Sequence, residues 1–279
     1  MSVAGINLAR RNLINQIEAD MQNKRELKDV ILLKDKLDDI KSNICITSSC
    51  YTDEQYRALK EENIDYIYYN DSYSPYVNSK YKDTQSPYIL VGSYGGLYKY
   101  KDKEIITDYS FNVLNSDNIY YLHKDGAKYV TLSVEASLED IKNVYSNYKY
   151  KFNADPNLEI TVYGKENLMT MKYCPLKRYG ECGKCKNNNY SLDDGYAKFP
   201  IIHEGCITHI INSKPTNLID DLKEISKYTN RFRLSFTNES YEETKEIIKK
   251  FKDKIFNNSN KKYFDSKNDT RAYYKREIL

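Results

Sequence analysis

Short apolar runs alternate with stretches of helical periodicity along most of this chain. The apolar runs, rich in β-branched residues and tyrosine, predict strands at residues 44–47, 64–69, 88–92, 105–115, 128–135, 158–164, 208–212 and 231–237. Apolar residues spaced three or four positions apart predict helices at residues 53–62, 117–125, 138–148, 217–228 and 241–256. Several of these helices begin near a good capping residue: Thr52, Ser116, Ser137 and Ser240. The alternation implies parallel strands, and so an α/β sheet or barrel.

Three parts of the chain depart from this alternation. Residues 1–42 carry a helical pattern, and we expect a helical segment there, ahead of an α/β barrel domain over residues 43–257. Residues 70–87 contain two prolines and no periodic apolar positions, so they predict a loop where a further strand and helix would stand. A barrel built from this chain would therefore be incomplete, one unit short. Residues 258–279 predict a polar C-terminal tail.

The composition is that of a soluble globular protein, with 40% hydrophobic and 30% charged residues. The net charge of +3 is too small to indicate a nucleic-acid partner by itself. No run approaches the roughly 20 apolar residues of a membrane helix, and Arg10, Arg11 and Glu18 interrupt any signal-peptide core. We therefore expect a cytoplasmic protein without a membrane partner, in which thiols stay reduced.

Four of the six cysteines follow one another closely: Cys174, Cys182, Cys185 and Cys206 are separated by seven, two and twenty residues. Because Gly183 lets the backbone turn between Cys182 and Cys185, both sulfurs can reach one ion. Four thiolates could hold zinc or ligate an iron–sulfur cluster, whereas a cytoplasmic location disfavours a disulfide. A redox-active pair of Cys182 and Cys185, or a set of idle thiols, is the alternative.

The other cysteines and the nearby histidines are weaker candidates for metal binding. Cys45 and Cys50 flank the first predicted strand, and we interpret them as core or surface residues rather than ligands. His203 and His209 lie on either side of Cys206, so either could support the metal site or replace one cysteine as a ligand.

Polar side chains follow several predicted strands, at the end where a parallel α/β barrel carries its active site. Two carboxylates beside one pocket could act there as acid and base. The alternative for each single residue is a helix cap or a turn former. The set as a whole favours a site at the mouth of the barrel, with these candidate catalytic residues: Asp108, Asn112, Ser133, Glu135 and Tyr163.

Several motifs also keep a recognisable order along the chain. They are DYSFNVLN, VTLSVE, VYGKENLMTMKYCPLK with its CGKC, FPI and INSKP. This order resembles the peptidase U32 family, the collagenase-like proteases, and most closely the C-terminal portion of its long members. The N-terminal INLARRNLINQIE resembles the segment that leads into that portion, and TRAYYKREIL resembles the family's closing tract. The resemblance extends over nearly the whole chain.

The resemblance implies a TIM-like (β/α) barrel with a cysteine-rich insertion at residues 171–207. It also implies that Cys174, Cys182, Cys185 and Cys206 bind a metal, with an iron–sulfur cluster of the [4Fe–4S] type as the first expectation and zinc as the alternative. The better understood relatives hydroxylate RNA or a quinone precursor without oxygen. Other relatives are described as collagen-degrading proteases.

Three functions are therefore open for this chain. The first is hydroxylation of RNA or a small molecule by a protein with an iron–sulfur site, acting alone or as a subunit. The second is a peptidase, for which the sequence shows no convincing pair of nucleophile and base. The third is a non-catalytic binding module with structural zinc. A separately encoded U32-type subunit, in place of the family's long N-terminal module, and RNA are candidate partners, whereas no DNA is expected.

Overall fold

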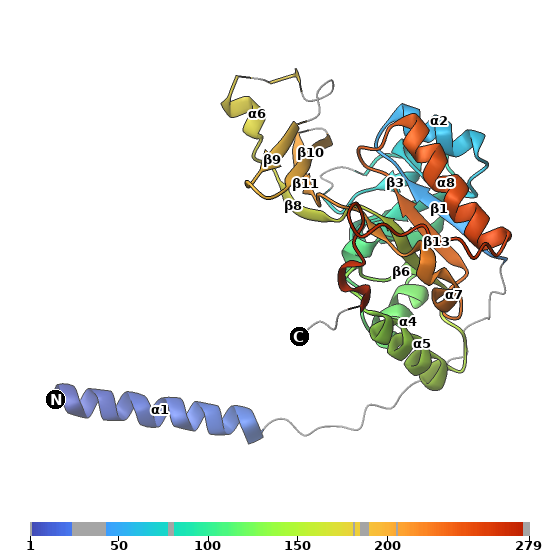
Figure 1. Cartoon of the computed structure of the whole chain (residues 1–279). Coiled ribbons are helices and arrows are strands. Elements are labelled where there is room, and N and C mark those ends of the chain that lie inside the picture. Colours follow the sequence, from blue (N-terminus) through green and yellow to red (C-terminus); the bar gives the residue numbers. More distant parts are fainter. Residues whose placement is uncertain are drawn as a thin grey trace. The chain divides into compact units, whose positions relative to one another are not determined.

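The computed structural model describes residues 2–23, 43–77, 81–180, 182–184, 190–204 and 206–275 (Figure 1). The chain divides into two compact units, Met1–Asp35 and Lys36–Leu279. The first unit contains helix α1 (Val3–Asn23), which agrees with the start of the predicted helical segment. The rest of that segment, residues 24–42, lies outside the described residues. No described helix has both the length and the hydropathy needed to cross a membrane.

The second unit is built on a nearly closed barrel of eight parallel strands. Their order around the barrel is β2-β1-β13-β7-β6-β5-β4-β3, and every neighbouring pair in it is parallel. The strands are β1 (Cys45–Ser49), β2 (Tyr66–Tyr68), β3 (Tyr73–Ser74), β4 (Tyr88–Val91), β5 (Glu104–Thr107), β6 (Ala127–Thr131), β7 (Leu158–Gly164) and β13 (Arg231–Ser235). A short strand, β12 (Thr216–Asn217), pairs antiparallel with β7. The predicted α/β, TIM-like barrel is confirmed.

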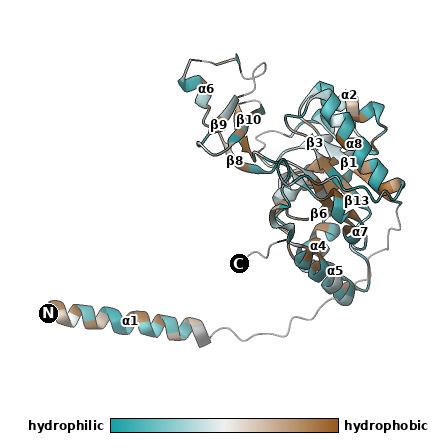
Figure 2. Ribbon diagram, in the orientation of Figure 1, coloured by the Kyte–Doolittle hydropathy of each residue, from teal (hydrophilic) through white to brown (hydrophobic). Residues whose placement is uncertain are grey.

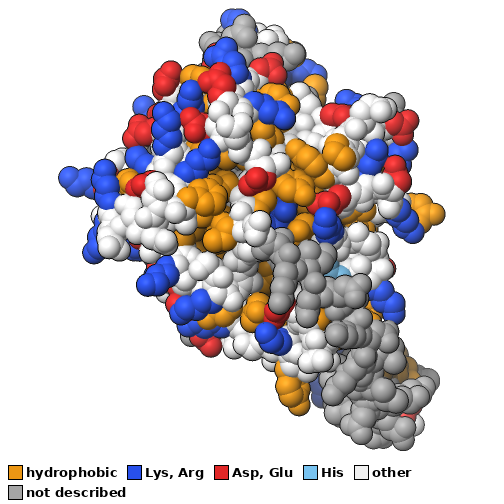
Figure 3. Space-filling model, turned by 90° about the vertical axis from the view of Figure 1, so that its right-hand side faces the viewer, with side chains coloured by type: hydrophobic (Ala, Val, Ile, Leu, Met, Phe, Trp, Pro, Cys, Tyr) orange, Lys and Arg blue, Asp and Glu red, His pale blue; other side chains and the backbone are white. Residues whose placement is uncertain are grey.

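Helices cover the outside of the barrel and bury their apolar faces against it. They are α2 (Asp53–Glu61), α3 (Tyr94–Lys99), α4 (Ser116–Lys124), α5 (Leu138–Phe152), α7 (Leu222–Ile225) and α8 (Tyr241–Phe256). The main hydrophobic core lies between the strands and the helices, and Figure 2 shows hydrophobic residues among the barrel strands. On the face shown in Figure 3, basic and acidic side chains are interspersed, in keeping with the small net charge.

Three of the four predicted helix caps are confirmed. Thr52, Ser137 and Ser240 each accept a hydrogen bond from a backbone N–H in the first turn, and each completes a capping box. The prediction for Ser116 was wrong by one residue. Asn115 is the cap instead, because its side-chain oxygen accepts from the backbone N–H of Asn118 at 2.8 Å.

The barrel has an open seam between β2 and β3, at the place where the sequence predicts a missing unit. A single turn of 3₁₀-helix, η1 (Asn70–Ser72), joins the two strands directly, and β3 has only two residues. Side chains partly replace the missing strand pairing. The Tyr88 hydroxyl lies 3.1 Å from the backbone nitrogen of Ile67 and 3.3 Å from its carbonyl oxygen. The expected incomplete barrel is therefore confirmed.

Charged side chains are buried inside the barrel. The side chains of strand β13 point alternately to its two faces. Phe232 and Leu234 join the hydrophobic core between the barrel and its helices, while Arg231 and Arg233 are buried inside the barrel. The Glu159 carboxylate on β7 lies between them, 3.4 Å from Arg231 Nε and 2.6 Å from Arg233 Nε. Arg233 also pairs with Asp108 at the end of β5. Each of these buried charges thus has an opposite charge beside it.

Hydroxyl groups complete the surroundings of Glu159. Thr47, Tyr68 and Thr131 donate hydrogen bonds to its two oxygens at 2.8, 2.9 and 3.1 Å. The Arg231 guanidinium lies 3.8 Å from the centre of the Tyr129 ring, in cation–π contact. Burial raises the pKa of Glu159, but Arg233 and Arg231 lower it more, so the pKa lies below its usual range. The network therefore holds an ionised glutamate in the barrel.

A four-stranded antiparallel sheet interrupts the barrel after β7, and we call it the insertion sheet. Its strands run in the order β8 (Asn167–Met171), β11 (Ile207–Ile211), β10 (Lys198–Glu204) and β9 (Tyr190–Asp193), with the short helix α6 (Pro175–Arg178) after β8. The strand predicted at residues 208–212 is present as β11, but it belongs to this sheet and not to the barrel. The predicted cysteine-rich insertion, residues 171–207, falls within these strands and their connections.

The C-terminal segment returns to the barrel. Thr270 bridges to Thr216 beside β12, and residues Ala272–Lys275 form a 3₁₀-helix, η5. Tyr274 is buried in the main core. The segment is polar, as the sequence predicts, yet part of it packs against the barrel through the buried side chain of Tyr274.

Candidate functional site

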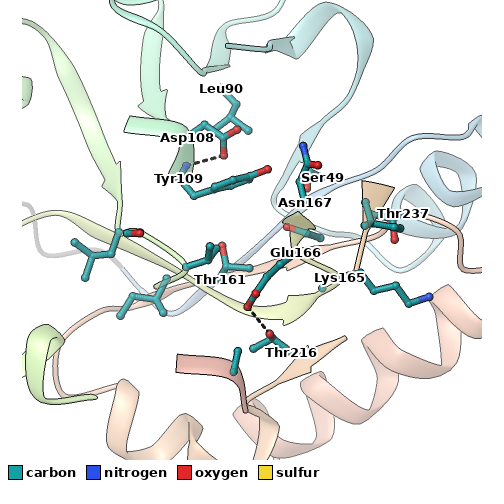
Figure 4. Close-up of a pocket in the computed structure, with 18 of the residues that line it drawn as sticks. Ser49, Leu90, Asp108, Tyr109, Thr161, Lys165, Glu166, Asn167, Thr216 and Thr237 are labelled. Atoms are coloured by element: carbon teal, nitrogen blue, oxygen red, sulfur yellow. Dashed lines mark hydrogen bonds between the residues drawn. The ribbon is translucent and has the colours of Figure 1, made fainter. Parts of the chain in front are cut away.

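A central cavity of about 440 Å³ lies at the carboxyl ends of the barrel strands (Figure 4). Residues at or just beyond the ends of five strands line it: Ser49 at the end of β1, Asp108 after β5, Ser133 after β6, Glu166 after β7 and Thr237 after β13. Parallel barrels place their chemistry at this end of the strands. The C-terminal segment adds Arg271, Ala272 and Tyr274 to the wall.

Asp108 is fixed at the edge of this cavity. Its carboxylate pairs with Arg233, and it accepts a hydrogen bond from the backbone N–H of Tyr109 at 2.9 Å (Figure 4). The Tyr73 hydroxyl lies 3.5 Å from its other oxygen. Only 2% of Asp108 is exposed. Asp108 therefore connects the cavity to the ion network inside the barrel and is suited to accepting hydrogen bonds there.

Glu166 is a carboxylate of the cavity that our sequence analysis missed. It lies in the short connection between β7 and β8, and its Oε1 accepts a hydrogen bond from Thr216 Oγ1 at 2.7 Å (Figure 4). No cation of the described residues lies within ion-pair distance of it. Burial raises the pKa of Glu166, and the Thr216 hydrogen bond lowers it less. A raised pKa makes Glu166 a candidate for the general acid or base of this cavity.

The predicted residues Ser133, Asn112 and Glu135 lie close together, but only Ser133 lines the cavity. Its hydroxyl donates to Asn112 Oδ1 at 2.6 Å and accepts from the Glu135 backbone N–H at 3.2 Å. Asn112 is exposed, with a left-handed backbone at φ 50°, and the Glu135 side chain is exposed as well. Their contacts support the turn after β6, and a catalytic role for the three stays a prediction.

Tyr163 packs into the outer layer rather than into the central cavity. Its ring contacts Phe236 and Phe251, with centroid distances of 5.7 and 6.0 Å, and its hydroxyl donates to Glu239 Oε1 at 3.4 Å. It lines a separate cavity of about 210 Å³. Residues 164–167, which follow it in sequence, line the central cavity instead. The catalytic role of Tyr163 is an untested prediction.

The described cysteines of the predicted metal site lie on connections of the insertion sheet. Cys174 is half-buried, Cys182 and Cys206 are exposed, and all three thiols are free. Cys185 lies outside the described residues. Among those described, no group of three His, Cys, Asp or Glu side chains is arranged to hold a metal ion. The donor chemistry of free thiols fits zinc or an iron–sulfur cluster, and the four-cysteine set stays a prediction.

One cysteine is adjacent to the central cavity. Cys174 Sγ lies 3.9 Å from His203 Nε2, and both His203 and Glu204 of strand β10 line the cavity. His209, the other histidine near Cys206 in sequence, is buried, and its Nδ1 lies 3.0 Å from both Asn167 Nδ2 and Thr170 Oγ1. The insertion sheet thus brings a thiol and the cavity wall together through His203.

Cys45 and Cys50 differ from these thiols. Burial raises the pKa of each to about 12, so both stay protonated at neutral pH. A protonated thiol is a poor metal ligand, which favours their interpretation as structural residues.

Comparison with known proteins agrees with the motifs in the sequence. The family model described as peptidase family U32 matches residues 98–278, which is more than half of the chain. No curated protein and no solved structure matches the chain. The match covers the cysteine connections and most residues of the central cavity. This chain therefore belongs to peptidase family U32.

Proposed function

We propose that this chain hydroxylates RNA or a small molecule in the central cavity, with an iron–sulfur cluster held by Cys174, Cys182, Cys185 and Cys206. The observation that carries the proposal is the 3.9 Å contact between Cys174 Sγ and His203 Nε2, because His203 also lines the cavity. A redox group held by these cysteines would lie beside the substrate rather than at a distant surface.

The chain's own residues would bind the substrate and move its proton. When bound, the cluster would supply electron transfer. Replacing C–H by C–OH needs an oxygen donor. With water as the donor, two protons and two electrons are released; the electrons would pass by way of the cluster to an electron acceptor, and Glu166, whose pKa burial raises, would take up one of the protons. Asp108 would accept a hydrogen bond from the substrate, because Arg233 keeps it in place.

The connections of the insertion sheet carry groups that suit an RNA substrate. Lys172, Lys177 and Arg178 are exposed there, and so are the rings of Tyr173 and Tyr179, at 53% and 78%. Basic side chains attract phosphates, and exposed aromatic rings stack on bases. A separately encoded U32-type subunit would be a partner in the same reaction.

The proposal is tested in cells that lack the gene, by mass spectrometry of RNA nucleosides and small metabolites. We expect one compound with an extra oxygen atom to disappear and to return with the wild-type gene. The Glu166→Gln variant should lower the amount of this compound by about 10²-fold or more, because the proton carrier is removed. Glu139→Gln, an exposed glutamate on α5, is the matched control and should restore it. A change in peptides instead, with no change in oxygenated compounds, would favour the peptidase and refute the proposal.

A further inference from the structure

A second cavity, of about 600 Å³, adjoins the central one at the open seam of the barrel, and we call it the seam cavity. The insertion sheet forms one of its walls, through Glu204, Ile207 and His209. Residues within the ranges 70–77 and 82–84, which follow β2, form another. Six residues line both cavities: Tyr109 and Asn167, which Figure 4 labels, and Tyr51, Asn70, Tyr73 and Glu204.

His209 carries an unpaired hydrogen-bond donor in the wall of the seam cavity. Its Nδ1 lies 3.0 Å from Asn167 Nδ2, an amide nitrogen that can only donate, so Nδ1 accepts and Nε2 carries the proton. Only 5% of His209 is exposed, and among the described residues its Nε2 has no hydrogen-bond partner. Glu204 Oε2 is 3.8 Å away, too far for a hydrogen bond. Because buried polar groups are nearly always paired, this Nε2–H is available to a ligand.

The spacing of His209 and Glu204 selects the chemical group that fits between them. One oxygen atom can lie within about 3 Å of both Nε2 and Oε2, since these two atoms are 3.8 Å apart. That oxygen has to accept from the histidine and donate to the carboxylate. A hydroxyl group does both, whereas a protonated amine cannot accept and an ionised carboxylate cannot donate. The pair therefore fits a hydroxyl group of a ligand.

The other lining residues indicate what carries this hydroxyl group. In the described part of the wall Lys82 is the only lysine or arginine, beside three acidic side chains, so the charge disfavours a phosphate. Asn167 Oδ1 is buried and has no donor among the described residues, so it can accept from a second hydroxyl group. Five tyrosines offer flat faces against which a ring can pack: Tyr51, Tyr73, Tyr76, Tyr100 and Tyr109. A neutral ring with several hydroxyl groups meets these conditions.

We propose that the seam cavity binds a sugar. One hydroxyl group lies between His209 and Glu204, a second donates to Asn167, and the ring packs against the tyrosines. A free sugar and the ribose of a nucleoside share this chemistry, and the test separates them. The inference does not depend on the proposed function, because neither a cluster nor a proton transfer enters it.

The test is ligand binding to the full chain, by saturation-transfer NMR and calorimetric titration. The probes are methyl β-D-glucopyranoside, methyl β-D-ribofuranoside and adenosine. We expect at least one of them to bind with a dissociation constant of about 1 mM or less. Binding of a glycoside assigns the site to a free sugar, and binding of adenosine alone assigns it to the ribose of a nucleoside.

Variants of the two partners test the contact. His209→Leu and Glu204→Ala should each weaken binding about tenfold, because each removes one hydrogen bond to the hydroxyl group. The Glu204 side chain is 40% exposed, so its loss leaves the fold intact even if His209→Leu does not fold. His209→Gln should recover most of the affinity, since its amide N–H can replace Nε2–H. His123→Leu is the matched control, because this histidine lines neither cavity, and it should bind like the wild type.

A deoxy ligand separates the contact from a change in structure. Among the single deoxy analogues of a probe that binds, one should bind about tenfold more weakly to the wild type and equally well to His209→Leu, because the contact is then already absent. No binding of any probe at about 10 mM would overturn the proposal and leave the cavity to water only. Equal affinity of the wild type, His209→Leu and Glu204→Ala would overturn it as well, since the sugar would then bind elsewhere.

Discussion

Replacing Glu159 by alanine is expected to lower the free energy of unfolding by about 3–5 kcal/mol, the usual cost of removing one partner from a buried ion pair. Arg231 and Arg233 would remain buried without their shared carboxylate, at 2% and 1% exposure. Three hydroxyl donors would lose their acceptor as well. Urea unfolding followed by circular dichroism measures the change.

Two variants keep this prediction testable. Glu135→Ala removes an exposed glutamate and should change stability by less than about 0.5 kcal/mol. If Glu159→Ala fails to fold, Glu159→Gln keeps the shape and removes only the charge, and it should still be clearly destabilised. A loss of less than about 1 kcal/mol in Glu159→Ala would contradict the role we assign to the network.

The same network predicts a dependence of stability on pH. The pKa of Glu159 is lower in the folded chain than the value of about 4.3 that an unfolded glutamate has. Its contribution is therefore complete above that value and is lost as pH falls through the folded pKa. The difference between wild type and Glu159→Gln should be largest near neutral pH and should shrink at strongly acidic pH.

Replacing Cys185 by serine is expected to abolish metal retention, because a serine hydroxyl does not replace a thiolate ligand at this kind of site. Cys174→Ser should have the same effect, and Cys174 is the thiol in contact with His203. Metal analysis of the purified variants measures the loss. Cys45→Ser is the matched control, since burial keeps that thiol protonated, and it should retain the wild-type metal content. Full retention in Cys185→Ser would contradict the four-cysteine assignment.

The barrel could be predicted from the sequence because its strands are local features. Runs such as the one at residues 158–164 are short and β-rich, and helices with capping residues separate them. The position of strand β11 could not be predicted in this way, because an apolar run does not show which strands pair with it. It was expected in the barrel, but it pairs with β8 and β10 in the insertion sheet.

The ion network and Glu166 could not be predicted for a related reason. In RFRLS the arginines alternate with apolar residues, which is typical of a strand with one face in water. Here the polar face points into the barrel, and only the three-dimensional arrangement brings Glu159 between the two arginines. Likewise, sequence placed Tyr163 at the cavity from its position near a strand end. The pleat of β7 directs its ring outward, whereas Glu166, three residues later, lines the cavity.

The central claim is that the cysteines of the insertion sheet hold an iron–sulfur cluster beside the cavity. The most direct test is the iron, sulfide and zinc content of the wild-type chain purified without oxygen, together with its visible absorption. Our account predicts a brown protein with iron and acid-labile sulfide in equal amounts. A colourless protein with one zinc ion per chain and no iron would contradict it.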